Sequence, residues 1–149
     1  MVQNRCRVKG SSSVTCVPCL RAIAEPHILN RIDRCLDELW SLHPGVPSTV
    51  RCRLRIANNE IVVNIVKHAT KGIDRPVGIQ MWVMVRDNDV VVTFEDDGIV
   101  AADGVIDREM PHELDESGRG IPLARATLSH LEYRRSHERN FWILVSEPF

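Results

Sequence analysis

Two runs of β-branched residues, separated by a short polar link, constrain the fold of this chain most strongly. The runs cover residues 79–85 and 90–95, and Asp87-Asn88-Asp89 between them supplies turn chemistry. Such runs favour strands, and a tight polar link makes two strands antiparallel neighbours. The centre of the chain is therefore predicted to be a β-hairpin.

Apolar residues recur at helical spacing in two segments that precede this hairpin. The first runs from Pro26, which fits a first helical turn, to Leu42, and His43-Pro44-Gly45 ends it. Its stripe consists of Leu29, Ile32, Leu36, Leu39 and Trp40. The second begins with Ser48 as a predicted N-cap and reaches about Thr70. Its buried stripe is predicted to be Val50, Leu54, Ala57, Ile61 and Ile65.

The segments after the hairpin suggest how the fold is completed. Residues 98–120 predict a long loop with one short helix, and residues 121–131 predict a helix with Leu123, Ala124, Leu128 and Leu131 on one side. Residues 132–135 and 141–145 predict a second hairpin around residues 137–140. Residues 14–23 suit a first strand. This order predicts an α/β two-layer sandwich, with helices on one face of a mixed, mostly antiparallel sheet. We expect a flexible tail at residues 1–13 and a single domain at residues 14–149.

Length, charge and hydropathy narrow the class of protein. A chain of 149 residues suits one domain, and 19 basic against 20 acidic side chains give a net charge of -1. This balance argues against a nucleic-acid or anionic-membrane binder, which is normally basic. No apolar run approaches the length of a membrane span, and the N-terminus lacks a signal-peptide core. We therefore expect a cytoplasmic protein.

The cysteines admit two interpretations. Cys16-Val17-Pro18-Cys19 has the spacing of a redox pair or of half a zinc site, but no second matching pair accompanies it. The chain has 5 cysteines, an odd number that does not suit a secreted disulfide framework. Ordinary reduced thiols, some of them buried, are the simpler interpretation.

Polar residues interrupt the second predicted helix on nearly one face. Glu60, Asn64 and His68 follow one another at four-residue spacing, and Lys67 lies three residues after Asn64. An unpaired carboxylate facing a core is costly, so this face either meets solvent or lines a pocket. A solvated edge of an amphipathic helix gives the same spacing. The residues by themselves leave both interpretations open.

A pocket lined by these side chains would have the chemistry of a phosphoryl-transfer site. The Asn64 carbonyl oxygen suits Mg²⁺, which keeps several waters and takes its other ligands from phosphates. Lys67 or His68 would meet phosphate charge, and Glu60 would accept a proton from a hydroxyl group or from water.

Two further segments would complete such a site. Phe94-Glu95-Asp96-Asp97-Gly98 ends a predicted strand, where an Asp can accept a hydrogen bond from an exocyclic amine such as that of adenine and the Gly lets the backbone approach the ring. Ser117-Gly118-Arg119-Gly120-Ile121 precedes a predicted helix, where glycines expose amides to phosphate. An ordinary strand end and a flexible hinge would look the same, so neither segment is specific alone.

Taken together and in this order, the three segments resemble those of the GHKL (Bergerat-fold, histidine-kinase-like) ATPases, and within them the small anti-sigma-factor serine/threonine kinases. The resemblance covers about residues 20–149. NEIVVNIVKHAT resembles the N-box, FEDDGI the Asp-x-Gly box, ESGRGIPLARATLSHLEYRR the Gly-rich box and RNFWILVSEPF the closing strand. The resemblance implies a Bergerat fold that binds ATP and Mg²⁺.

Roles for individual residues follow from this resemblance. It implies that Glu60 is the catalytic base and Asn64 the Mg²⁺ ligand, with Lys67 and His68 near phosphate. It further implies that Asp96 holds the adenine amino group with Gly98 beside it. The phosphate lid would contain Gly118, Arg119 and Gly120, and residues 109–119 would be mobile without ATP.

The chain departs from the family pattern at two positions. Val100 stands where many GHKL proteins have a second glycine, which mildly favours the small kinases over histidine kinases. Pro122 follows the Gly-rich turn where another hydrophobic residue is more usual, and a proline there would stiffen the lid. No phosphoacceptor-histidine helix precedes the ATPase region, so we do not expect a complete sensor histidine kinase.

The resemblance also implies partners. The expected function is an anti-sigma factor that phosphorylates a STAS-domain anti-anti-sigma protein and sequesters a sigma factor, as a homodimer without direct contact to nucleic acid or membrane. The alternatives are a non-catalytic, nucleotide-dependent partner-binding module, and a switch kinase that activates a phosphatase. Trp40 is a candidate partner contact but fits the core better, and Trp82 and Trp142 are interpreted as packing residues.

Overall fold

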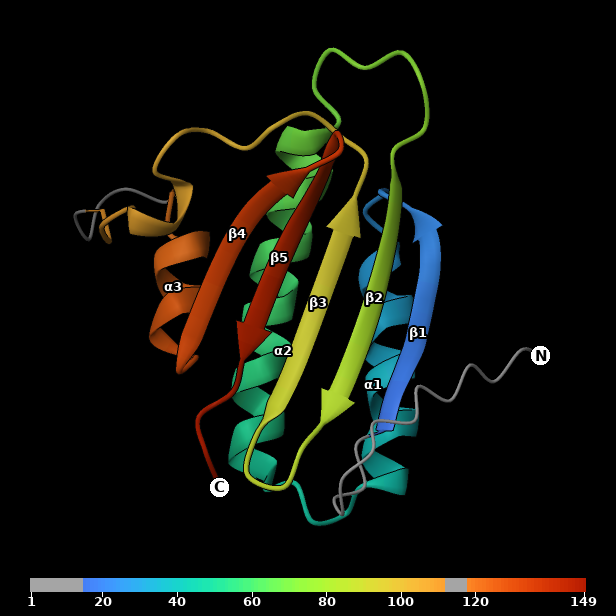
Figure 1. Cartoon of the computed structure of the whole chain (residues 1–149), viewed down its shortest axis with the longest axis vertical. Helices are drawn as coiled ribbons and strands as arrows, with labels where there is room; N and C mark the ends of the chain where they lie inside the picture. The colour runs from blue at the N-terminus through green and yellow to red at the C-terminus, as the bar shows by residue number, and fades with distance from the viewer. Residues whose placement is uncertain (1–14, 112–117) are drawn as a thin grey trace.

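The fold is built on a five-stranded antiparallel sheet (Figure 1). The structure is a computed structural model and describes residues 15–111 and 118–149. The described elements, in chain order, are β1 (Thr15–Ile23), α1 (Ile28–Leu42), α2 (Ser48–Asn64), the π-helix η1 (Ile65–Ala69), β2 (Gly78–Val85), β3 (Val90–Asp96), the 3-10 helix η2 (Val105–Asp107), α3 (Gly120–Ala126), β4 (His130–Ser136) and β5 (Arg139–Val145). The predicted tail at residues 1–13 and most of the predicted lid at residues 109–119 lie outside the described residues.

The sheet has the strand order β1-β2-β3-β5-β4. The central hairpin predicted from sequence is confirmed, since β2 and β3 pair from Val85 opposite Val90 onwards. The second hairpin is also confirmed: β4 and β5 close with Ser136 opposite Arg139, and its two turn residues have positive φ, as in a type I′ turn. Every described pairing is antiparallel, so the sheet is more regular than the mixed sheet predicted.

Helices α1 and α2 cover one face of the sheet, and α3 packs beside α2 (Figure 1). Along β2 and β3 every second residue is buried, because alternate side chains of a strand point to opposite faces. The stripe predicted for the second helix is buried in full: Val50, Leu54, Ala57, Ile61 and Ile65. The predicted two-layer α/β sandwich is therefore confirmed. In the part of the chain that the structure describes, no helix is long and apolar enough to cross a membrane.

The last helix was predicted too long. Residues 121–131 were expected to form one helix, but α3 ends at Ala126 and Leu131 lies in β4, opposite Leu144 of β5. Leu123, expected on the buried side, is 37% exposed. The apolar spacing of Ala124, Leu128 and Leu131 fits a helix, but Leu131 reaches the core as an inward residue of a strand. Pairing with β5 overrides the local helical pattern.

Two predicted helix starts also differ from the structure. The first helix begins at Ile28, two residues after Pro26. Ser48 is the first residue of α2, and the cap position belongs to Pro47, which makes no side-chain cap hydrogen bond. Helix ends are the least certain part of any assignment from sequence.

The end of the second predicted helix has a distinct geometry. Its α-helical part stops at Asn64, and residues 65–69 form η1 with the wider turn of a π-helix. Such turns occur often at functional sites. The Ala69 carbonyl oxygen accepts a hydrogen bond of 2.9 Å from the Ile99 amide, which ties this helix end to the loop after β3.

Gly98 permits that contact. A Cβ atom at position 98 would lie 2.4 Å from the Ala69 carbonyl oxygen and 2.6 Å from the Ala69 Cβ. No real structure tolerates such distances, so any side chain here would push the loop away from η1. Helix-to-loop packing therefore requires glycine at this position, and the approach of the Gly98 backbone to a ligand ring stays a prediction.

We predict that Gly98→Ala lowers the free energy of unfolding by about 1–3 kcal/mol, the usual cost of overpacking a tight contact. Chemical denaturation measures this change. Gly45→Ala is the matched control, because a Cβ at position 45 meets nothing within 4 Å and its φ is not in the left-handed region. That control should be neutral or slightly stabilising. Equal stability of the two variants would contradict the packing argument.

Candidate functional site

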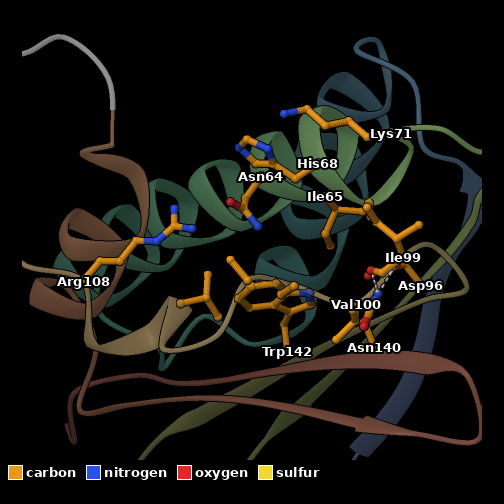
Figure 2. A pocket seen from close by; sticks show the side chains of 14 residues that line it. Asn64, Ile65, His68, Lys71, Asp96, Ile99, Val100, Arg108, Asn140 and Trp142 are labelled. Atoms are coloured by element: carbon orange, nitrogen blue, oxygen red, sulfur yellow. Dashed lines mark hydrogen bonds between the residues drawn. The ribbon is translucent and has the colours of Figure 1, made fainter.

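A pocket of about 250 Å³ opens between η1, the ends of β3 and β5, and the loop that follows β3 (Figure 2). Its lining residues are Asn64, Ile65, His68, Ala69, Lys71, Asp96, Ile99, Val100, Ala101, Ala102, Val105, Arg108, Asn140 and Trp142. The walls are largely apolar, with a few polar groups, which is the usual character of a small-molecule site.

Asp96 and Asn140 form the polar end of this pocket. They are direct partners in the β3–β5 ladder, and the two-residue period of both strands turns their side chains toward the helices. Asn140 Nδ2 donates to Asp96 Oδ1 at 2.8 Å, and the Gly98 amide donates to the same oxygen at 3.0 Å. Asn140 Nδ2 also donates to the Ile99 carbonyl at 2.8 Å. These bonds fix the carboxylate to the loop that forms one wall.

The orientation of the Asn140 carboxamide is fixed from the other side. Its Oδ1 accepts hydrogen bonds from the Tyr133 hydroxyl at 2.6 Å and from Arg135 Nη1 at 2.8 Å. Arg135 also donates to the Gly98 carbonyl, and the Tyr133 hydroxyl accepts from the Ala101 amide. Two donors at Oδ1 require Nδ2 to face Asp96. Sequence reasoning missed Asn140 because it was predicted in the turn at residues 137–140, whereas the structure places it in β5, directly opposite Asp96.

The Asp96 carboxylate retains one unsatisfied oxygen. Asp96 is 1% exposed, and its Oδ2 is buried without a hydrogen-bond partner among the described residues. Burial raises the pKa of this carboxyl, and hydrogen bonding from the Asn140 side chain, the Gly98 amide and the Trp142 side chain opposes that rise. The Trp142 contact lacks standard hydrogen-bond geometry. A buried acceptor without a partner is unfavourable, so a ligand N–H at Oδ2 would be strongly stabilised.

Basic side chains line the part of the pocket that lies away from Asp96. His68, Lys71 and Arg108 line it with exposed side chains, whereas Lys67 does not line it. The pKa of His68 lies below its ordinary value because of partial burial, and then because of the positive charges of Lys71, Arg108 and Lys67. Figure 2 shows Lys71 beside His68 and Arg108 across from them. The grouping of cations indicates a place for an anion. Lys71 and Arg108 were not among the predicted site residues.

Glu60 lies one helical turn before Asn64 and meets the Gly-rich turn. A Cβ atom at Gly120 would lie 2.7 Å from Glu60 Oε2, so the carboxylate is in close contact with the first residue of α3. The preceding Gly118 has φ of 77°, a backbone conformation that favours glycine. Pro122 is buried in the first turn of α3, where a proline needs no intrahelical N–H partner. Glycine at position 120 thus gives Glu60 its space.

The structure brings together only some of the predicted site residues. Asn64, His68 and Asp96 line the pocket. Glu60, Lys67, Gly118, Arg119 and Gly120 do not line it, and Gly98 lies behind the Asp96 carboxylate, where it donates to Oδ1. The roles assigned to these residues remain predictions.

Of the Cys16-Val17-Pro18-Cys19 pair singled out in the sequence, the Cys16 side chain lies outside the described residues. Within residues 15–111 and 118–149, no group of three or more His, Cys, Asp or Glu side chains is arranged to hold a metal ion. Cys35 and Cys52 are free thiols, and Cys35 donates to the Cys19 carbonyl. Burial raises the pKa of the Cys35 thiol, which disfavours a reactive thiolate. A Mg²⁺ ion would still fit, because it needs few protein ligands and Asn64 offers a carbonyl oxygen at the pocket.

Comparisons with known proteins agree with this geometry. A family model described as the histidine kinase-like ATPase domain matches residues 23–145, well over half of the chain. A comparison with curated proteins finds no match. The matched range contains Glu60, Asn64, Asp96 and the Gly118–Gly120 turn. The chain therefore belongs to the histidine kinase-like ATPase family.

Proposed function

We propose that this protein is an anti-sigma factor with serine/threonine kinase activity. It binds ATP·Mg²⁺ and phosphorylates a STAS-domain anti-anti-sigma protein, so that phosphorylation of that antagonist controls release of a sigma factor. The observation that carries the nucleotide part is the buried Asp96 Oδ2, which has no partner of standard geometry in the described part of the chain and lies at one end of a pocket whose other part is lined by cations. The kinase specificity, the protein partners and a homodimeric state rest on the motif resemblance.

Each end of the pocket suits one end of ATP. Asp96 offers its acceptor to the adenine amine, while the apolar residues Ile65, Ile99 and Val105 supply surfaces for the ring. His68, Lys71 and Arg108 offer positive charge to the phosphates. Asn64 lies next to His68 and supplies the carbonyl oxygen for Mg²⁺ (Figure 2). When bound, the ion would supply positive charge that neutralises the phosphates during transfer.

We assign to Glu60 the role of the base that accepts the hydroxyl proton. A serine or threonine hydroxyl of the partner attacks the γ-phosphorus, its proton passes to Glu60, the new O–P bond forms, and the bond to the bridging oxygen breaks to release ADP. The contact between Glu60 Oε2 and Gly120 places this carboxylate at the start of α3, beside the Gly-rich turn. A hydroxyl approaching that turn would meet the base.

One observation favours a second candidate, a nucleotide-dependent binding module without kinase activity. Glu60 contacts Gly120 and does not line the pocket in the described conformation. If Glu60 also stays outside the pocket when nucleotide is bound, its carboxylate does not act on the phosphate-accepting hydroxyl, and the protein only binds. A kinase that activates a phosphatase shares all of the chemistry above and differs only in its partner.

Asp96→Asn separates binding from stability. The variant should lose roughly 10- to 100-fold in ATP affinity, because a charge-assisted hydrogen bond of about 1.5–3 kcal/mol is removed. Its free energy of unfolding should be unchanged or raised, because a buried charge disappears. Calorimetry of ATP binding and chemical denaturation measure the two quantities. Equal loss of both would mean that Asp96 is a structural residue.

Asn64→Ala provides the companion measurement. If Asn64 binds the ion, the variant should bind ATP with the same affinity whether or not Mg²⁺ is present, while wild type binds more tightly with Mg²⁺. Calorimetry with and without the ion gives this comparison. A retained Mg²⁺ effect in the variant would remove Asn64 from the proposed metal site.

Glu60→Gln tests the kinase. The variant should bind ATP within about twofold of wild type and transfer phosphate at least about 100-fold more slowly, the lower end of general-base effects. Transfer of labelled γ-phosphate to a panel of STAS-domain proteins measures the rate. A normal rate would exclude the role of Glu60, and nucleotide binding without transfer by wild type would favour the binding module.

His68 predicts a pH dependence. Its pKa is lowered in the nucleotide-free protein, and bound phosphate would raise it by supplying opposite charge. Binding then takes up a proton, so ATP affinity should rise roughly two- to fivefold as pH falls from about 7.5 to about 6. His68→Gln is the control, because any titration of ATP itself persists in it. The same pH dependence in that variant would exclude His68 as its source.

A further inference from the structure

We infer that the Trp142 indole N–H is a second base-reading group: it donates to a ring nitrogen beside the adenine amine, while Asp96 Oδ2 accepts from the amine. This inference rests on the proposed binding of ATP and adds a specificity-determining residue to it. Sequence reasoning interpreted Trp142 as a packing residue, and the structure gives it a place in the pocket wall.

Trp142 is a buried donor without an acceptor. It is 2% exposed, and Nε1 has no hydrogen-bond partner among the described residues. Buried tryptophans usually satisfy this N–H, and an unpaired one is costly. The Asp96 Oδ2 atom at the same pocket is the complementary case, a buried acceptor without a donor. One ligand edge that carries both a donor and an acceptor would satisfy the two groups together.

The sheet places the two groups close to one another. Asp96 is opposite Asn140 in the β3–β5 ladder, and Trp142 is the next inward residue after Asn140, so it lies diagonally across from Asp96. Figure 2 shows the indole nitrogen turned toward the Asp96 and Asn140 side of the pocket. Trp142 lowers the Asp96 pKa as a hydrogen-bond donor does. The contact between Nε1 and Oδ2 lacks standard hydrogen-bond geometry, so a ligand edge that offers each atom a well-aligned partner would replace it.

Neighbouring groups hold Asp96 Oδ2 and Trp142 Nε1 in position. The Asn140 carboxamide and the Gly98 amide occupy Asp96 Oδ1, which leaves Oδ2 as the free acceptor. Tyr133 packs against the Trp142 ring with the ring centroids 4.6 Å apart, and its hydroxyl binds Asn140. Donor and acceptor are therefore fixed by one set of contacts. Such preorganisation reduces the cost of binding.

Adenine has the matching pattern. Its amine is a donor, and ring nitrogens that flank the amine, N1 and N7, are acceptors. Hypoxanthine and guanine carry a carbonyl oxygen in place of the amine, which would set an acceptor against the Asp96 carboxylate. The pair should therefore select purines with an amine at this position. N1 and N7 are both ring nitrogens beside the amine, so either could accept the indole hydrogen bond. Adenine analogues in which one of these nitrogens is replaced by carbon distinguish the two.

The experiment measures the affinity of the full chain for four nucleotides: ATP, 1-deaza-ATP, 7-deaza-ATP and inosine triphosphate. We expect inosine triphosphate to bind at least about tenfold more weakly than ATP, and one of the deaza analogues to bind roughly five- to twentyfold more weakly. The weaker deaza analogue identifies the ring nitrogen. Equal affinity for ATP and both deaza analogues would overturn the proposal without any variant.

The Trp142→Phe variant, tested with ATP and with the deaza analogues, completes a thermodynamic cycle of protein and ligand changes. The variant should bind ATP about as weakly as wild type binds the affected deaza analogue, and it should no longer distinguish the two ligands. Trp82→Phe is the matched control, since Trp82 lies in β2 and does not line the pocket, and it should keep the discrimination. Discrimination that persists in Trp142→Phe would overturn the proposal. Melting curves establish that both variants fold.

An indole resonance gives a readout that does not depend on a variant. In nitrogen-15-labelled protein, ATP should move the Trp142 Nε1–H proton signal downfield, and the affected deaza analogue should not. An unmoved signal with ATP bound would overturn the proposal. Absence of any ATP binding would instead contradict the proposed function, so failures of the two proposals are distinguishable.

Discussion

The hydrogen bond from Asn140 Nδ2 to Asp96 Oδ1, 2.8 Å long, is the contact on which the site depends. It joins the ends of β3 and β5 at directly opposite positions and commits one carboxylate oxygen to the protein. The Gly98 amide shares that oxygen, and Ile99 binds both Asn140 and Ala69 through its backbone. One polar cluster thus connects the sheet, the loop after β3 and the end of the long helix. Loss of any member would shift the acceptor that remains free.

The two parts of the pocket carry opposite charge and therefore need different groups on a ligand. At the Asp96 end a negative group is buried, and burial raises the pKa of its carboxyl. Around His68 several positive charges lie together, and their repulsion helps to lower the pKa of the imidazole. Each arrangement is unfavourable by itself and becomes favourable with a ligand that donates at one end and carries negative charge at the other. A nucleoside triphosphate has both properties, and perturbed pKa values of this kind are typical of functional sites.

Local sequence patterns predicted much of the fold and part of the site. The β-branched runs and polar link fixed the central hairpin, and the stripe through Val50, Leu54 and Ile61 predicted a buried helix because helical period places these residues on one face. Asn64, His68 and Asp96 were found through motifs, since their chemistry and spacing are properties of contiguous residues. The boundary between α3 and β4 was not predictable in this way, because Leu131 becomes a strand residue by pairing with Leu144.

The sequence by itself determined which elements form and which residue types could hold a nucleotide, since period, turn chemistry and motif order are all local. Tertiary structure alone decided which side chains meet. Asn140 and Trp142 reach Asp96 through β3–β5 register, over more than forty residues of chain, and Arg108 approaches His68 from a loop without periodicity. The tertiary structure also decided that Lys71 lines the pocket and that Lys67 does not. Register and close packing depend on contacts between distant segments, and no local pattern encodes them.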